Sequence, residues 1–207
     1  MSSPERNAKL EVIRAAERYC FQRGVDALTL EAVAREAERP LGVVTGLFHD
    51  EGALLDAILE RHQSPYERRW EEVLPAIDTP RGALSLLVST IASLIHDEDG
   101  GPAYVAVAAQ MCVSPRHRLT SRPATTTPTA LKLMVKLIGS TRAPFELLSM
   151  RFDRFAAILF SSTFAWYLQG AARLSEQAFV EDLVDTLEFV ALAEPTDATQ
   201  RALRSAS

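Results

Sequence analysis

Apolar residues recur every three or four positions along almost the whole chain, which is the spacing of one face of an α-helix. No segment alternates apolar and polar residues with enrichment in β-branched types, as a half-buried strand would. At 207 residues, 47% of them apolar, the chain is long enough to bury a core without disulfides. The sequence therefore predicts an all-α protein.

The apolar stripes, together with residues that start and end helices, place the expected elements. In the first part of the chain the expected helices cover residues 7–23, 30–36, 40–48 and 51–74. In the second part they cover residues 81–96, 104–113, 129–139, 144–172 and 176–193. Thr29 is expected to cap the second helix, since its hydroxyl can accept a hydrogen bond from a free amide of the first turn. Pro65 is expected to kink the fourth helix or to divide it.

Composition argues against several classes of function. The net charge of −5 excludes a strongly basic surface, so any contact with nucleic acid has to be local. The two cysteines and four histidines are far apart and fit no metal-binding, disulfide or catalytic spacing. The acidic run at residues 97–99 is interpreted as a solvated loop. We therefore expect no cofactor, no metal site and no enzymatic activity, and the polar N-terminal residues predict a cytoplasmic protein.

Three short helices with a tight turn between the second and the third are typical of a helix-turn-helix. Within them, residues 24–37 (GVDALTLEAVAREA) resemble the TetR family of bacterial regulators. Weaker similarity continues through Gly42 and Phe48 and again at residues 53–55, so that the resemblance covers roughly the first 60 residues. The remainder of the chain agrees with the family in the number, length and placement of its helices.

The resemblance implies a TetR-like fold with four parts. Residues 1–50 would form a helix-turn-helix head that binds DNA, and residues 51–74 a connecting helix. Residues 75–194 would form a helical domain for ligand binding and dimerisation, and residues 195–207 a frayed tail. The implied protein is a homodimeric repressor, and a ligand in its C-terminal cavity changes the separation of the two heads and releases the DNA operator.

The residues expected to contact DNA lie on the first three helices. A local basic edge and the exposed part of the third helix supply them, with Thr45 as the expected base contact. The set is Arg6, Lys9, Thr29, Arg39, Leu41, Val43 and Thr45. The alternative interpretation is that the basic residues are solvated helix surface.

The third helix departs from the family pattern. Family members have glycine, an aliphatic residue and a serine or threonine where this chain has Glu38, Arg39 and Pro40. They have aromatic residues where Thr45 and Gly46 stand, and a lysine that grips a phosphate where Glu51 stands. Residues 1–62 carry a net charge of −3. These departures support a second hypothesis, in which a TetR-like protein has lost operator binding and acts as a module that binds a small molecule or a protein, or as an enzyme.

Aromatic and polar residues of the central helices predict a ligand cavity for a largely apolar effector. The candidate ligand-binding residues are Tyr104, Gln110, Met111, Phe152, Trp166 and Tyr167. The alternative is that these side chains fill the core. The last two helices carry more apolar surface than one small core requires, which predicts a homodimer formed as a four-helix bundle; the alternative is again that both helices are core.

Overall fold

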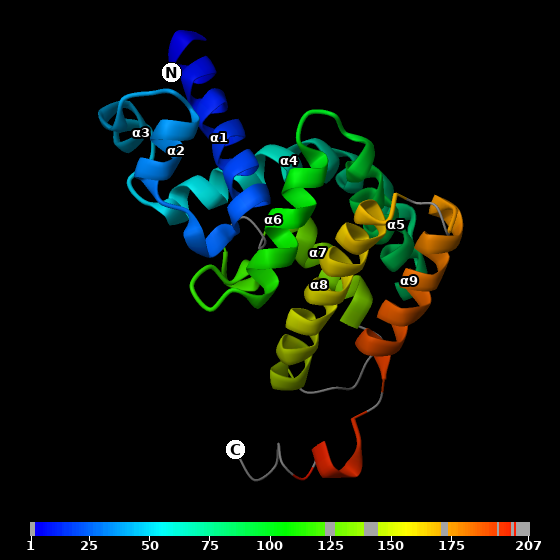
Figure 1. The fold of residues 1–207 in the computed structure, drawn as a ribbon. Coiled ribbons are helices and arrows are strands. Elements are labelled where there is room, and N and C mark those ends of the chain that lie inside the picture. Colours follow the sequence, from blue (N-terminus) through cyan, green and yellow to red (C-terminus); the bar gives the residue numbers. More distant parts are fainter. Residues whose placement is uncertain are drawn as a thin grey trace.

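The computed structural model describes residues 3–122, 127–138, 145–170, 174–193, 195–199 and 201. Helices account for nearly all the regular structure of these residues, and they contain no strand, which confirms the all-α prediction (Figure 1). A small head of three helices lies at one end, and a larger helical body lies at the other. The helix α4 (Glu51–Val73) runs from the head into the body.

The head consists of α1 (Ser3–Arg23), α2 (Leu30–Glu36) and α3 (Leu41–Leu47). Its core is made by fully buried residues of α1 and α2, among them Val12 and Val33, which pack around Val44 of α3. Thr29 caps α2 as predicted, because its Oγ1 accepts from the amide of Ala32 at 3.1 Å. The last turn of α1 ends at Gly24, whose φ of +91° suits a residue without a side chain.

The helix α4 continues through Pro65 as one element, so the alternative that this proline divides the helix is wrong. Its N-terminus is capped by Asp50, whose side chain accepts from the amide of Ala53 at 2.7 Å. Eight buried side chains along α4, which include Leu54, Ile58, Tyr66 and Trp70, hold it against both the head and the body.

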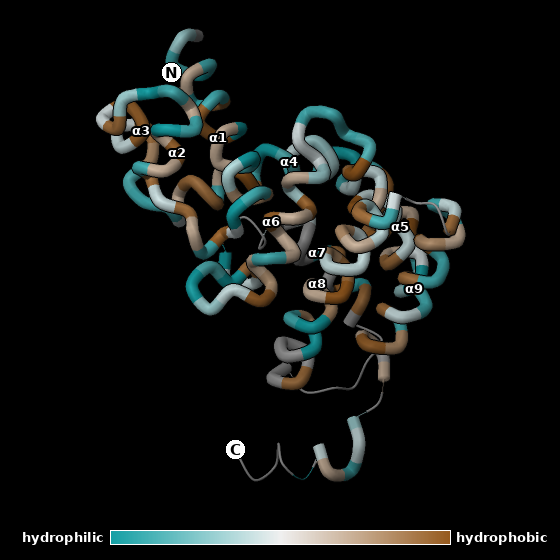
Figure 2. The backbone as a smooth tube through the Cα atoms, viewed as in Figure 1, coloured by the Kyte–Doolittle hydropathy of each residue, from teal (hydrophilic) through white to brown (hydrophobic). Residues whose placement is uncertain are grey.

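The body contains α5 (Pro80–Ser93), α6 (Gly101–Val113), α7 (Pro128–Ile138), α8 (Phe145–Leu168) and α9 (Glu176–Leu192), with short 3-10 turns between some of them. The helix α8 packs against α6 and α9, and α9 also packs against α5 (Figure 1). Hydrophobic and hydrophilic residues are interleaved along these helices (Figure 2). Within the described ranges, no helix combines the length and apolar character that a membrane span requires.

The ends of several elements differ from the prediction. The helix α1 begins at Ser3 rather than at residue 7, and α5 ends at Ser93, before a 3-10 turn over residues 94–96. The helix α6 begins at Gly101, three residues earlier than expected, because Gly100 adopts φ +97° and Pro102 is tolerated in a first helical turn. The helix α8 ends at Leu168, before Gly170 with φ +69°. In the tail, residues 197–199 are helical, and Thr196 accepts from the amide of Thr199; residues 202–207 lie outside the described residues.

Candidate functional sites: an exposed helix and an apolar cavity

The turn between α2 and α3 fixes how α3 is presented at the surface. Glu38 adopts φ +52°, a conformation that costs a residue with a side chain about 1 kcal/mol or more. The turn is closed by the amide of Arg39, which donates to the carbonyl of Ala34 at 2.9 Å. The buried side chain of Val44 then anchors α3 to the head and leaves the opposite face of this helix in solvent.

The exposed face of α3 is almost entirely apolar. Leu41 and Val43 are 41% and 39% exposed, and a Cβ atom added at Gly42 or Gly46 would meet no neighbour within 4 Å. The hydroxyl of Thr45 donates to the carbonyl of Leu41 at 3.2 Å, within its own helix. The hydroxyl oxygen keeps lone pairs that can accept from a base N–H group, so α3 offers a shallow apolar surface with one polar group.

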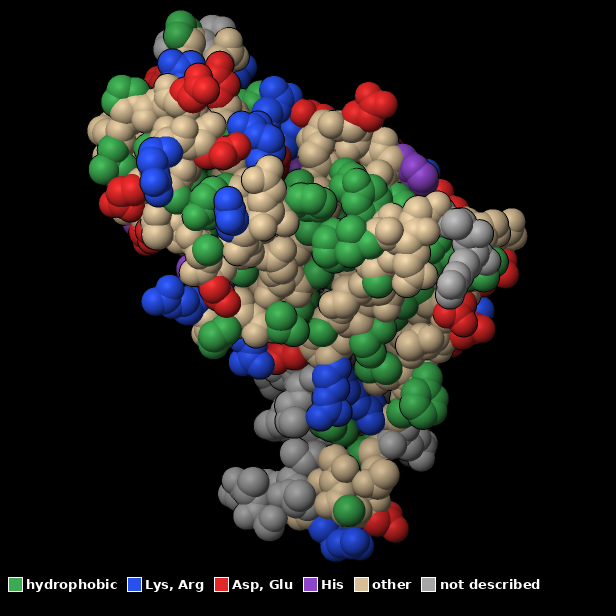
Figure 3. All heavy atoms as spheres, viewed as in Figure 1, with side chains coloured by type: hydrophobic (Ala, Val, Ile, Leu, Met, Phe, Trp, Pro, Cys, Tyr) green, Lys and Arg blue, Asp and Glu red, His purple; other side chains and the backbone are tan. Residues whose placement is uncertain are grey.

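The basic residues predicted beside α3 are largely engaged with the head itself. Arg39 pairs with Glu11 of α1, and the ammonium of Lys9 lies 5.5 Å from the centre of the Phe48 ring. Arg6 and Arg35 are exposed. Acidic and basic side chains are mixed over the head, with no uniform basic patch on the face shown (Figure 3). Contact with DNA at the predicted residues therefore stays a prediction.

A mainly apolar cavity of about 100 Å³ lies between α4, α5, α6, α7 and α8. Tyr66 and Trp70 of α4 and Tyr104 of α6 form part of its wall, and the two tyrosine hydroxyls are 3.0 Å apart and hydrogen-bonded. Burial raises the pKa of both tyrosines, so both hydroxyls are protonated at neutral pH. The remaining wall is formed by Gln63, Glu67, Leu87, Ile91, Leu119, Thr120, Leu133, Leu137, Phe152, Phe155, Ala156, Leu159 and Phe160.

The structure brings two of the six predicted ligand-binding residues to this cavity, Tyr104 and Phe152. The other four have different surroundings. Met111 is fully buried but does not line the cavity. Trp166 stacks on Phe179 of α9, with ring centres 4.5 Å apart, and Tyr167 stacks on Phe164. Trp166 thus belongs to the α8–α9 packing rather than to the cavity wall.

Gln110 joins the body to the head instead of facing the cavity. Its Oε1 accepts from the amide of Val25 at 2.8 Å, and its Nε2 donates to the carbonyl of Cys20. Nearby, the hydroxyl of Ser114 donates to the carboxylate of Asp26 at 2.6 Å. The end of α6 is therefore fastened to the loop that follows α1.

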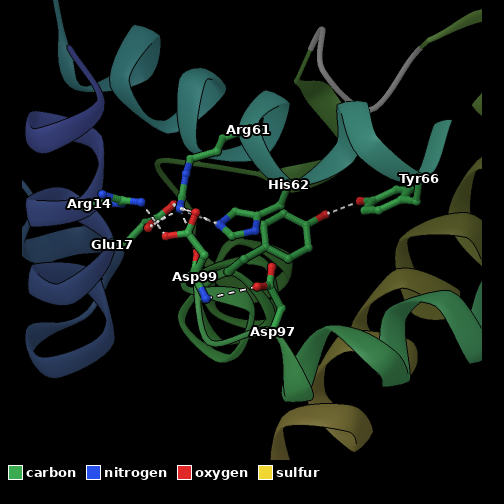
Figure 4. Close-up of polar contacts among 8 residues, drawn as sticks. Arg14, Glu17, Arg61, His62, Tyr66, Asp97 and Asp99 are labelled. Carbon is green, nitrogen blue, oxygen red and sulfur yellow. Dashed lines mark hydrogen bonds and ion pairs between the residues drawn. The ribbon is translucent and has the colours of Figure 1, made fainter. Parts of the chain in front are cut away.

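A buried ionic cluster at the same junction was missed by the sequence analysis (Figure 4). Glu17 of α1 is 2% exposed and accepts from Arg61 at 2.7 Å and from His62 at 2.9 Å. Arg61 and Arg14 both pair with Asp99, in the loop before α6. One signal could have revealed the cluster, because Glu17 interrupts the apolar stripe of the first helix.

Residues 97–99 form an exposed loop, as predicted, and within it Asp99 pairs with Arg61 and Arg14. Desolvation acts to raise the pKa of Asp99, but hydrogen bonds and ion pairs with these two arginines outweigh this and lower it. The ring of His62 also packs on Tyr104, with ring centres 4.9 Å apart. The cluster thus extends from α1 to a residue of the cavity wall.

The surroundings of both cysteines disfavour the thiolate form that a nucleophile requires. Burial, with a smaller contribution from Glu17, raises the pKa of Cys20 to about 12. Burial, with a smaller contribution from Asp153, raises the pKa of Cys112 to about 12. Among the residues that the structure describes, no group of three or more His, Cys, Asp or Glu side chains is placed to hold a metal ion.

No protein-family model matches the sequence, and no curated protein matches it. Solved structures do match the fold. NalD, the secondary repressor of the MexAB-OprM multidrug efflux pump in Pseudomonas aeruginosa, has a TM-score of 0.65 and 17% identity, over 94% of this chain and 100% of NalD. The transcriptional regulator FadR from Bacillus subtilis, in complex with stearoyl-CoA, has a TM-score of 0.60 and 13% identity, over 89% of this chain and 98% of FadR.

SmeT in complex with triclosan has a TM-score of 0.59 and 19% identity, over 87% of this chain and 90% of SmeT. At these identities the likeness establishes the fold alone. The chain therefore has the TetR-like, all-helical architecture that the sequence predicted.

Proposed function

We propose that the chain is a DNA-binding transcriptional regulator, a repressor whose affinity for DNA falls when a small, largely apolar ligand occupies the cavity. One observation carries the proposal: the same helix serves both sites. Three residues separate the end of α3 from the start of α4, and further along α4 contributes Tyr66 and Trp70 to the cavity wall. Any shift of α4 that a ligand favours is passed to α3.

The junction cluster provides a second connection. Arg61 and His62 follow the head-proximal half of α4, and both bind Glu17 of α1. A ligand that prefers one placement of α4 over another shifts the populations by the difference in its two affinities. We propose that this difference changes the separation of two heads in a homodimer, as the resemblance to the TetR family implies.

The proposed contact with DNA is made by the exposed face of α3. Leu41 and Val43 suit the methyl groups of thymine in the major groove, and Thr45 is the polar group available to a base. Arg6, Lys9 and Arg39 lie on the head with α3 and are proposed to contact phosphates. Thr29, which caps α2, is proposed to lie next to the DNA backbone. Few phosphate contacts predict a modest affinity with a shallow dependence on salt.

The test compares two variants at positions of equal exposure. Val43 of α3 and Val73 of α4 are each 39% exposed, and Val73 lies at the far end of its helix from the head. Binding is measured at low salt by fluorescence anisotropy with a labelled random-sequence duplex. Wild type should bind, and Val43→Asp should bind with an affinity at least about tenfold lower, because the new charge faces phosphates.

Val73→Asp should bind like wild type. Equal affinities of the two variants, or no binding by wild type at low salt, would contradict the proposal. The second result would favour the hypothesis of a TetR-like protein that no longer binds an operator.

A further inference from the structure

We propose that the cavity selects a small organic cation, an ammonium ion attached to an aromatic or branched apolar group, with Glu67 as its counter-ion. The inference deepens the proposed function by naming the class of effector. Binding of the ligand can nevertheless be measured without DNA, so the two proposals can fail separately.

The cavity wall contributed by α4 is one continuous face of that helix. Gln63, Tyr66, Glu67 and Trp70 have the spacing i, i+3, i+4 and i+7, and all four line the cavity. Helix geometry therefore places a carboxylate among aromatic rings and amide or hydroxyl groups. The buried side chains of Tyr66 and Trp70 fix the orientation of this face.

Glu67 is the single charged side chain among the described residues that line the cavity, and no lysine, arginine or histidine accompanies it there. Several other half-buried or buried carboxylates have cationic partners: Glu17 binds Arg61, and Asp153 binds Arg118. In the part of the chain described here, Glu67 has no hydrogen-bond or ion-pair partner. The half-buried carboxylate is thus left to be neutralised by a ligand.

The charge of Glu67 acts on the polar groups of the cavity. Burial is the main cause that raises the pKa of Tyr66 and of Tyr104, and Glu67 raises both further. The two hydroxyls are hydrogen-bonded to each other and stay protonated, so their oxygens keep lone pairs that can accept from an N–H group. The polar part of the cavity is therefore rich in acceptors and carries negative charge.

The rest of the wall also favours a cation over a neutral or anionic ligand. Six aromatic side chains line the cavity, and the faces of such rings attract ammonium groups. These residues are Tyr66, Trp70, Tyr104, Phe152, Phe155 and Phe160. The volume of about 100 Å³ is below the roughly 150 Å³ of a cavity that holds benzene, so one ring with a short substituent is the largest ligand expected, and the wall must yield slightly to admit it.

The experiment uses three probes that differ in charge but share a ring: benzylamine, which is protonated at pH 7, neutral benzyl alcohol, and anionic benzoate. The chain has two tryptophans, Trp70 on the cavity wall and Trp166 outside it. The variant Trp166→Phe leaves Trp70 as the reporter, and quenching of its fluorescence gives a dissociation constant for each probe. Benzylamine should bind about tenfold more tightly than benzyl alcohol, and benzoate should bind most weakly.

Glu67→Gln in the same background should keep the shape of the wall and abolish the preference for benzylamine. Glu72→Gln is the matched control, since Glu72 is an exposed residue of α4 that does not line the cavity, and it should keep the preference. The proposal is overturned if benzyl alcohol binds as tightly as benzylamine, if Glu67→Gln keeps the preference, or if benzylamine fails to quench Trp70. None of these results bears on whether the head binds DNA.

Discussion

Glu17 is the buried charge on which the junction between head and body depends. Its carboxylate holds both Arg61 and His62, and in the described part of the chain no buried side-chain nitrogen or oxygen lacks a hydrogen bond. Removing this carboxylate takes a counter-charge from the Arg61 guanidinium and the hydrogen-bond acceptor from His62, which costs far more than the loss of an exposed pair.

Glu17→Ala should therefore destabilise the protein by about 3–5 kcal/mol. Glu11→Ala, on the same helix, removes the exposed pair with Arg39 and should cost about 0–1 kcal/mol. Urea unfolding followed by circular dichroism measures both. Equal and small effects would show that the cluster does not hold the junction.

His117 is expected to make the stability of the folded protein depend on pH in the mildly acidic range. Burial and the charge of Arg122 lower its pKa below the ordinary value of 6.5, and its Nδ1 lies 3.3 Å from Nη2 of Arg122, which makes Nδ1 the acceptor of a neutral ring. The folded state binds a proton at His117 less readily than the unfolded state does. The contribution of this residue to the free energy of unfolding is therefore complete above pH 6.5 and is lost as the pH falls below it.

The melting temperature should accordingly fall between pH 7.5 and pH 5.5 in wild type, and fall less in His117→Gln, where the titrating group is gone. Thermal unfolding of both proteins in matched buffers measures the difference. Identical pH profiles would contradict the assignment of this titration to His117.

Among the elements, α3 contains two glycines that lower its stability as a helix but keep its exposed surface flat. Glycine costs a helix interior about 1 kcal/mol relative to alanine, and α3 has two glycines in seven residues. A Cβ atom at either position meets nothing within 4 Å, so nothing in the protomer requires glycine there. A flat surface on α3 is useful if another molecule approaches its backbone.

Gly42→Ala with Gly46→Ala should raise the stability by up to about 1 kcal/mol per site and weaken binding to DNA. Urea unfolding and duplex anisotropy on the same samples separate the two effects. Greater stability with unchanged DNA affinity would mean that DNA does not approach this face.

An acidic residue in the first turn of α4 is expected to lower the affinity of the head for DNA. Glu51 stands at a helix N-terminus, where the resemblance to the TetR family places a lysine that grips a phosphate. Glu51→Lys should tighten binding to any duplex and steepen the salt slope by about 0.9, the value of one phosphate contact. Glu72→Lys, at the other end of α4, makes the same charge change and should leave the slope unaltered. Equal changes in both variants would assign the effect to net charge alone.

Local signals made most elements predictable. The cap at Thr29, the stripe of α9 and the glycine after α1 each depend on neighbours within one or two turns, and the structure places those helices within a few residues of the prediction. The cavity was only partly predictable. Tyr104 and Phe152 were identified from composition, whereas Trp166 was assigned to the cavity although it packs on α9, because helical periodicity does not say which neighbour a buried aromatic faces.

For the whole molecule, the surplus apolar stripe expected to mark a dimer lies largely within the protomer. Leu183 and Leu187 of α9 are 3% and 0% exposed and belong to the core shared with α5 and α8. The apolar surface that remains for a partner includes Leu168 of α8 and Phe189 of α9, at 63% and 76% exposure. Hydrophobic side chains are also visible over the middle of the face where α6 and α8 run (Figure 3).

We predict a homodimer through α8 and α9. Sedimentation at micromolar concentration should give about twice the chain mass of 22.8 kDa. Leu168→Glu with Phe189→Glu should give monomers, because it places charge in the proposed interface, whereas Val135→Glu on α7, at a residue of 65% exposure, should leave the dimer intact. A monomeric wild type would contradict the four-helix interface.

The proposed function requires that the head recognises a DNA sequence. Selection from a library of random duplexes at low salt, followed by sequencing of the retained molecules, measures this directly. A dimeric regulator should enrich a sequence with two inverted half-sites, separated centre to centre by about one helical turn of DNA, 10–10.5 base pairs, or a multiple of it. A retained pool that is still random after repeated rounds would contradict the proposal that α3 recognises an operator.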